Sequence, residues 1–191
     1  MAERRADAQR NRTAVLQAAQ EAVERDGAAA LRVGAVAAAA GVGPGTVYRA
    51  FGSKRGLLLA LVDERERRLQ ERVLRGRPPL GPGAPAAERL VAFVDALHRL
   101  TAEQREVLVA ADEGAPTSRY LTGAHAAWRQ HVAVLLAELH PDADAGVLAE
   151  LVLAPLTAAL HVHLLDERAV PAARVRAELL RLARLVAAPG P

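Results

Sequence analysis

The amino-acid sequence predicts an all-α fold. Apolar residues recur at three- and four-residue steps along most of the chain, which is the spacing of one face of a helix. Alanine, leucine, valine and arginine dominate a composition with only 3% aromatic residues, and no stretch shows a convincing strand pattern. With 191 residues and 51% hydrophobic content, the chain is long enough to bury a sizeable core.

The first helix is predicted over residues 7–26. Leu16, Ala19 and Val23 form an apolar stripe along it, because they follow one another at three- and four-residue steps. Gly27 is placed to end this helix, since glycine adopts the left-handed backbone that often terminates helices.

Two short helices, over residues 36–40 and 46–50, come before a longer fourth one. Ser53 is a suitable N-cap for the fourth helix, which is expected to continue to residue 75. Seven of the ten residues from 76 to 85 are glycine or proline, so no regular element can cross them. We interpret this stretch as a linker.

Further helices are predicted beyond the linker. Apolar residues mark one over residues 90–100 and a separate, shorter one over 107–111. After a break at residues 114–118, a long helical pattern runs from 120 to 139, where His140 and Pro141 stop it.

The last two helical stretches carry the broadest apolar stripes, and Pro155 interrupts the first of them. The sequence leaves open whether this proline kinks its helix or splits it. Stripes this wide predict pairing with a second copy of the chain, although an ordinary monomer core would produce the same pattern. The residues predicted to line the dimer interface are Leu148, Leu151, Val152, Leu156, Leu160, Val175, Leu179, Leu182 and Val186.

Positive charge is concentrated in the first part of the chain. Residues 1–77 carry a net charge of +6 and residues 78–191 carry −3. This distribution favours a module that faces a polyanion, although a solvated charged face explains it equally well. Cysteine is absent, the N-terminus has no apolar signal segment, and the longest apolar run, residues 151–165, is shorter than a membrane span of about 20 residues. We therefore expect a cytoplasmic protein without a membrane partner.

The spacing of residues 36–51 is that of a helix-turn-helix. Two helices that cross steeply need a small residue at their contact and a residue that tolerates positive φ at the turn. Ala37 is the small residue at the contact and Gly41 is the residue that tolerates positive φ. Valines on both sides of the turn pack the two helices together. The scaffold residues predicted in this way are Val36, Ala37, Gly41, Val42, Val47 and Phe51.

These residues resemble the tetracycline-repressor-like (TetR) family of transcriptional regulators. The resemblance covers about residues 10–62 and rests on AAAAGV, GPGTVYRAF, and the SK pair followed by LLLALV. It implies an N-terminal three-helix helix-turn-helix DNA-binding domain with a basic arm over residues 1–53. The remainder, residues 54–191, would form a C-terminal helical ligand-binding and dimerisation domain, with a connecting helix over 54–75 and a flexible linker over 76–85.

The resemblance also implies which residues touch DNA, because the helix after Gly43 would enter the major groove. Glycines there let the backbone approach the duplex, Tyr48 would bond a phosphate, and Lys54 would hold a phosphate by charge. Arg49 could read a guanine or hold the DNA backbone. The DNA-contacting residues implied are Arg32, Gly43, Pro44, Gly45, Thr46, Tyr48, Arg49 and Lys54.

Two positions depart from the family pattern. Ala50 stands where histidine is common, so one phosphate contact is missing. Arg32 stands where serine or threonine commonly caps the second helix, so that helix could begin late or fray, although Arg32 could itself reach phosphate. The basic N-terminal arm is a further candidate for contact with DNA, or else a disordered tail; its arginines are Arg4, Arg5, Arg10 and Arg12.

Members of the family usually hold a small molecule among the middle helices of the second domain. The residues that could line such a pocket, or simply the edge of a core, are Phe93, Asp95, His98, Tyr120, His125 and Trp128. The six histidines show no metal-ligand spacing, and no nucleophile, P-loop or dinucleotide motif has a suitable context. We expect no metal, no cofactor and no enzymatic activity.

The function that the sequence favours is that of a homodimeric, ligand-responsive repressor acting on a palindromic double-stranded DNA operator. Its partners would be the operator, an unidentified small-molecule effector and a second copy of the chain. The alternative is a dimeric helical interaction protein whose helix-turn-helix no longer reads specific DNA. A helical enzyme is a distant third possibility.

Overall fold

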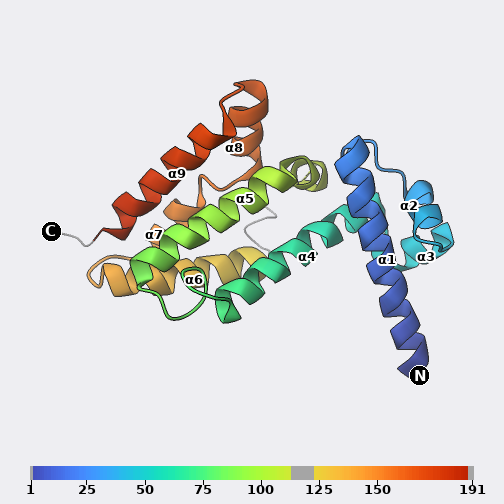
Figure 1. Ribbon diagram of the computed structural model, residues 1–191, viewed down its shortest axis with the longest axis horizontal. Helices are drawn as coiled ribbons and strands as arrows, with labels where there is room; N and C mark the ends of the chain where they lie inside the picture. Colours follow the sequence, from blue (N-terminus) through green and yellow to red (C-terminus); the bar gives the residue numbers. More distant parts are fainter. Residues whose placement is uncertain (1, 113–122, 189–191) are drawn as a thin grey trace. The chain divides into compact units, whose positions relative to one another are not determined.

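The computed structural model describes residues 2–112 and 123–188, and these residues form helices joined by turns, without strands (Figure 1). The predicted all-α fold is therefore confirmed. The chain divides into two compact units. Of the described residues, 2–64 and 106–112 belong to the first unit, and 65–105 and 123–188 belong to the second.

The first unit contains three helices and the beginning of a fourth. These are α1 (Ala2–Asp26), α2 (Val33–Ala39), α3 (Pro44–Phe51) and the first half of α4 (Lys54–Arg75). Gly27 ends α1 with a φ of +82°, as predicted. The helix begins at Ala2 rather than at residue 7, so the basic residues expected in an arm lie on α1.

Small and branched side chains fill the core of the first unit. Since α2 and α3 are only seven and eight residues long, each must hold its place by tertiary packing rather than by its own helix propensity. The buried residues come from α1, the turn after it, α2, α3, α4 and the end of α5; those with the least exposure are Val15, Ala19, Ala28, Val36, Ala37, Val47 and Leu57.

The second unit begins with the rest of α4. It continues through α5 (Ala86–Asp112), α6 (Gly123–Leu139), α7 (Ala145–Leu153), α8 (Ala158–Val162), the π-helical turn η2 (His163–Glu167) and α9 (Ala172–Ala187). The last seven residues of α5 count with the first unit. Two separate helices at 90–100 and 107–111 were expected, and this expectation is wrong. Residues 101–106 contain no glycine or proline, so the helix continues through them.

Pro155 splits its helix. The structure ends α7 at Leu153, and Thr157 begins α8 by accepting a hydrogen bond from the backbone N–H of Leu160 through its hydroxyl oxygen, at 3.1 Å. A new N-cap two residues after the proline explains why the chain restarts rather than bends. By length and composition alone, the segment Ala145–Glu167 could cross a membrane, a test that core helices of soluble proteins also pass.

Large apolar side chains form the core of the second unit. Helix α6 packs closely on α7, and α9 runs beside α5 (Figure 1). Arg176 of α9 fastens those two helices with its Nε 2.6 Å from Oδ1 of Asp95 on α5. The linker, residues 76–85, contains turns but no helix, as predicted, and its Leu80 is buried in the same core.

Candidate functional site

The turn between α2 and α3 has a defined hydrogen-bond pattern. Gly41 has a φ of +68°; its N–H donates to the carbonyl of Ala38, and the N–H of Val42 donates to the carbonyl of Ala37. This is the Schellman arrangement, which satisfies the last carbonyls of a helix and turns the chain sharply. The role predicted for Gly41 at the turn follows from this geometry.

The contact between α2 and α3 is close because one residue is small. Ala37 is completely buried, and Val36 and Val47 are each only 1% exposed. A larger side chain at 37 would push the two helices apart, because protein interiors leave little free volume. The packing of α2 against α3 therefore fixes the orientation of α3.

Helix α3 presents an outward face with little side-chain bulk at its start. Gly43 is the N-cap, Pro44 occupies the first turn, and both are exposed along with Gly45. An added Cβ at either glycine would meet nothing within 4 Å, so the surface above this helix end is open. Tyr48 follows one turn later with 52% of its area exposed. A large neighbouring molecule could therefore approach the α3 backbone closely.

The polar groups of this face are within reach of one another. Arg49 lies with its Nη2 3.2 Å from the hydroxyl oxygen of Thr46, so both side chains occupy the same side of α3. Lys54 lies at the start of α4, and its ammonium donates to the carbonyl oxygen of Ala29 at 2.7 Å. The ammonium therefore ties α4 to the turn after α1, a structural role that was not expected from the sequence.

Arg12 has a contact that sequence spacing could not indicate. Its guanidinium lies 4.7 Å from the centre of the Phe51 ring, which joins α1 to the end of α3 by a cation–π interaction. Arg10 pairs instead with Asp7 on the same helix. Arg32 is the exposed N-cap of α2 and makes no capping bond through its side chain, yet α2 begins directly after it. A late start of this helix, considered from the sequence, is not observed.

Residues 15–61 match the family model of bacterial regulatory proteins of the tetR family. These residues contain the whole of α2, the turn and α3 described above.

The N-terminal domain belongs to the TetR family. TetR-family members are DNA-binding helix-turn-helix transcription regulators, so this domain is a DNA-binding module. The individual DNA contacts implied for Arg32, for residues 43–46, and for Tyr48, Arg49 and Lys54 stay predictions.

Solved structures of TetR-family and other regulators share the fold along nearly the whole chain. A protein from Rhodococcus sp. described as a TetR-family transcriptional regulator is 23% identical, with a TM-score of 0.69, and the match covers 94% of this chain and 100% of that one. The fatty acid degradation regulator FadR from Bacillus halodurans is 17% identical, with a TM-score of 0.66, and the match covers 90% of this chain and 93% of that one. A TetR/AcrR-family regulator from Thermobifida fusca is 21% identical, with a TM-score of 0.65, and the match covers 91% of this chain and 96% of that one. No curated protein is significantly similar in sequence.

The described residues predicted to line a ligand pocket all lie in the second unit, and their role there stays a prediction. Phe93 is fully buried, with its ring 5.5 Å from that of Trp128. Asp95 pairs with Arg176 and Arg99, and its hydrogen bonds to these arginines hold its pKa below the usual value. His125 lies with its Nε2 3.0 Å from Oε2 of Glu150 on α7. Tyr120 lies outside the described residues.

His98 forms a buried pair with His161 of α8. The Nδ1 of His98 is 2.8 Å from the Nε2 of His161, and the Nδ1 of His161 is 2.8 Å from the carbonyl oxygen of Thr157. That carbonyl can only accept, so His161 carries its proton on Nδ1 and accepts from His98 through Nε2. Burial lowers the pKa of both histidines, which keeps the pair neutral. Among the described residues, no three histidine, aspartate or glutamate side chains converge on a metal position.

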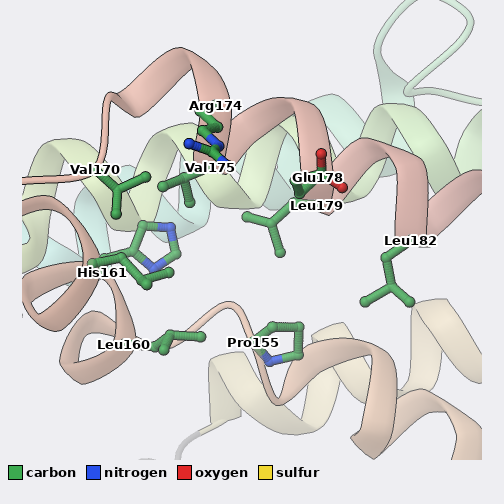
Figure 2. Close-up of a pocket in the computed structure, with 10 residues that line it drawn as sticks. Pro155, Leu160, His161, Val170, Arg174, Val175, Glu178, Leu179 and Leu182 are labelled. Atoms are coloured by element: carbon green, nitrogen blue, oxygen red, sulfur yellow. The ribbon is translucent and has the colours of Figure 1, made fainter. Parts of the chain in front are cut away.

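The predicted interface residues on the last helices divide between the core and the surface. Within the described chain, Leu151 and Leu182 are strongly exposed, at 62% and 45%. The others are buried or half-buried in this chain. A pocket of about 290 Å³ lies between α8 and α9, with Pro155 and Leu182 toward one end and His161 and Val170 toward the other (Figure 2). Seven of its ten lining residues are apolar, and the other three are His161, Arg174 and Glu178.

Proposed function

We propose that this protein is a ligand-responsive transcriptional repressor that binds a palindromic DNA operator as a homodimer in the cytoplasm. The observation that carries the proposal is the exposed face of α3, held by a tight turn within a TetR-family domain. Since base edges are reached from the major groove, α3 is the element proposed to read the operator. Catalysis has no part in this function.

Two side chains on α3 are suited to different tasks. Tyr48 projects into solvent and offers a hydroxyl to a phosphate, while Arg49 offers the guanidinium that best matches a guanine edge. The hydrogen bond of Arg49 to Thr46 keeps that guanidinium on the same side as the threonine hydroxyl. We propose Tyr48 for positioning and Arg49 for reading sequence.

Lys54 is proposed to act in two ways. Its ammonium donates to Ala29 in this structure and has two further donors, which a phosphate could accept. The start of α4 adds the partial positive charge of a helix N-terminus. Lys54 could therefore contact a phosphate while its hydrogen bond to the Ala29 carbonyl stays in place.

Two variants test the proposal in a salt-titrated mobility-shift assay with genomic fragments from around the gene. Tyr48→Phe removes one hydroxyl from an exposed ring, so folding should be unaffected while affinity falls several-fold. Arg49→Ala should weaken binding by about 1–3 kcal/mol and relax preference at one base position. Arg75→Ala, an exposed arginine on α4, is the matched control and should bind like wild type. If both variants bound DNA with the affinity of the wild type, the proposal would be wrong. The alternative, a protein whose helix-turn-helix does not read specific DNA, would then be favoured.

The proposed homodimer is supported by exposed leucines on the last helices. Leu151 of α7 and Leu182 and Leu185 of α9 present apolar surface to solvent in a single chain, and only 28% of the apolar segment around α7 and α8 is buried. A second copy that packed on α7, α8 and α9 would cover this surface. Leu151→Glu should lower the sedimenting mass to that of a monomer, whereas Leu74→Glu, at an equally exposed leucine of α4, should not. A dimeric Leu151→Glu variant would contradict this interface.

The proposed effector site is supported by buried polar groups that have no partner in the described residues. The side-chain amide of Gln104 is unpaired at both its oxygen and its nitrogen, and Nε1 of Trp128 is unpaired as well. Unpaired buried groups are costly, so a bound molecule whose polar atoms reached either side chain would stabilise it. A thermal-shift screen of hydrophobic metabolites, with Trp128 fluorescence as the reporter, tests this idea. Gln104→Leu should raise the melting temperature without effector and abolish the shift caused by any hit.

A further inference from the structure

A groove on the second unit runs between α4 and α5. It has a volume of about 630 Å³, and Pro79 and Leu80 of the linker line it together with the two helices. This volume lies within the range of about 300–1,000 Å³ that is usual for small-molecule sites. None of the α3 residues or the α8–α9 pocket residues line it.

The walls of the groove are rich in arginine. Arg65, Arg68 and Arg72 follow one another at three- and four-residue steps on α4, so their side chains share one face of the helix. Arg99 of α5 joins them. Two carboxylates, Asp95 and Glu103, also line the groove, which leaves its walls with a net charge of +2.

The two carboxylates are already held by arginine side chains. Glu103 has its Oε2 3.4 Å from Nη1 of Arg65. Asp95 accepts from Arg99 and, at 2.6 and 3.0 Å, from Arg176 of α9, which keeps its carboxylate ionised. These contacts orient two of the groove's guanidinium groups, those of Arg65 and Arg99.

The floor of the groove is apolar. Leu69 and Leu80 are buried, and Leu100 and Ala96 are half-buried beside them. A free inorganic anion would gain nothing from such a floor, whereas a molecule with an anionic end and an apolar or flat body would use both parts.

We propose that this groove binds a small phosphorylated molecule of nucleotide size. Its phosphate groups would lie against the α4 arginines, because a guanidinium matches phosphate oxygens in paired hydrogen bonds. The body of the molecule would lie on the apolar floor. Duplex DNA fits less well, because its backbone offers phosphates without an apolar part and the groove is a hollow rather than a ridge.

Binding there would act directly on α4. The same helix that carries the three arginines supplies Leu57, Leu58 and Leu61 to the core of the first unit. A ligand that restrains the second half of α4 therefore acts on an element shared by both units.

Isothermal titration of the full chain with ADP, pyrophosphate and adenosine tests the proposal. ADP should bind, pyrophosphate should bind more weakly, and adenosine more weakly still. The double variant Arg68→Ala/Arg72→Ala should lose at least about tenfold in ADP affinity, since charge-assisted hydrogen bonds are strong. Arg67→Ala/Arg75→Ala removes the same charge from exposed positions of the same helix outside the groove, and should bind ADP like wild type.

Three results would overturn the proposal. One is the absence of ADP binding by the wild type at about 50 mM salt, where phosphate contacts are strongest. Another is an equal loss of ADP affinity in the two double variants, which would show a diffuse charge effect. The third has two parts: a random DNA duplex displaces ADP from the wild type, and the Arg68→Ala/Arg72→Ala variant no longer binds that duplex. This result would assign the groove to DNA. Tyr48→Phe should bind ADP normally, so the outcome is independent of the operator proposal.

Discussion

His131 should make the stability of this protein depend on pH. Its ring lies edge-on to Phe93 with centroids 5.0 Å apart, and its Nε2 is buried without a partner in the described residues. Burial first, and the nearby charge of Arg89 second, lower the pKa of His131 from 6.5 to about 4. The folded protein therefore keeps this imidazole neutral where the unfolded chain would protonate it.

The sign and size of the effect follow from proton linkage. Between the two pKa values the unfolded state binds more protons, so the contribution of His131 is complete above 6.5 and is lost as the pH falls toward 4. At about pH 5 the lost stability is about 2 kcal/mol. The lowered pKa values of His98 and His161 act in the same direction and add to the loss in the wild type.

Urea unfolding of the wild type and His131→Leu at about pH 7.5 and about pH 5 isolates this contribution. The variant keeps His98 and His161, so it should lose about 2 kcal/mol less than the wild type on acidification. Equal m-values would show that both proteins expose the same surface on unfolding. If both proteins lost the same stability on acidification, the surroundings of His131 would not be holding its imidazole neutral.

Three further substitutions test the packing of the first unit by urea unfolding. Lys54→Met removes the 2.7 Å bond to Ala29 and should lower the free energy of unfolding by about 1 kcal/mol; no change would mean that the bond is absent in solution. Gly41→Ala should cost about 1–2 kcal/mol, because the added Cβ meets nothing within 4 Å and only the positive φ is unfavourable. Ala37→Leu should cost about 1–3 kcal/mol by overfilling the α2–α3 contact, and unchanged stability there would contradict that contact.

The helix-turn-helix could be predicted because its signals are local. Gly41 permits the turn, Ala37 the close contact, and Pro44 the start of α3, and each acts within a few residues of itself. The same is true of Ser53, whose hydroxyl accepts the N–H of Gly56 at 3.0 Å as an N-cap should. Because these signals act between residues close together in the sequence, they predict the turn and the helix starts without any information about long-range contacts.

Contacts between distant residues could not be predicted in this way. Arg12 reaches Phe51, Lys54 reaches Ala29, and His98 meets His161, although no periodicity relates these positions. The merging of two expected helices into α5 has a simpler cause. Five of the six residues from 101 to 106 have polar side chains, which interrupt an apolar stripe without breaking a helix. The hydropathy pattern alone therefore predicts a gap that the structure does not have.

The proposed function requires that α3 reads a specific palindromic operator. Selection of bound duplexes from a random-sequence library, with the full chain at near-physiological salt, tests it most directly. An inverted repeat whose half-sites lie about one helical turn or a multiple of it apart should be enriched, and Arg49→Ala should select a changed consensus. Binding that enriches no sequence, or an unchanged consensus when Arg49 is replaced, would contradict it.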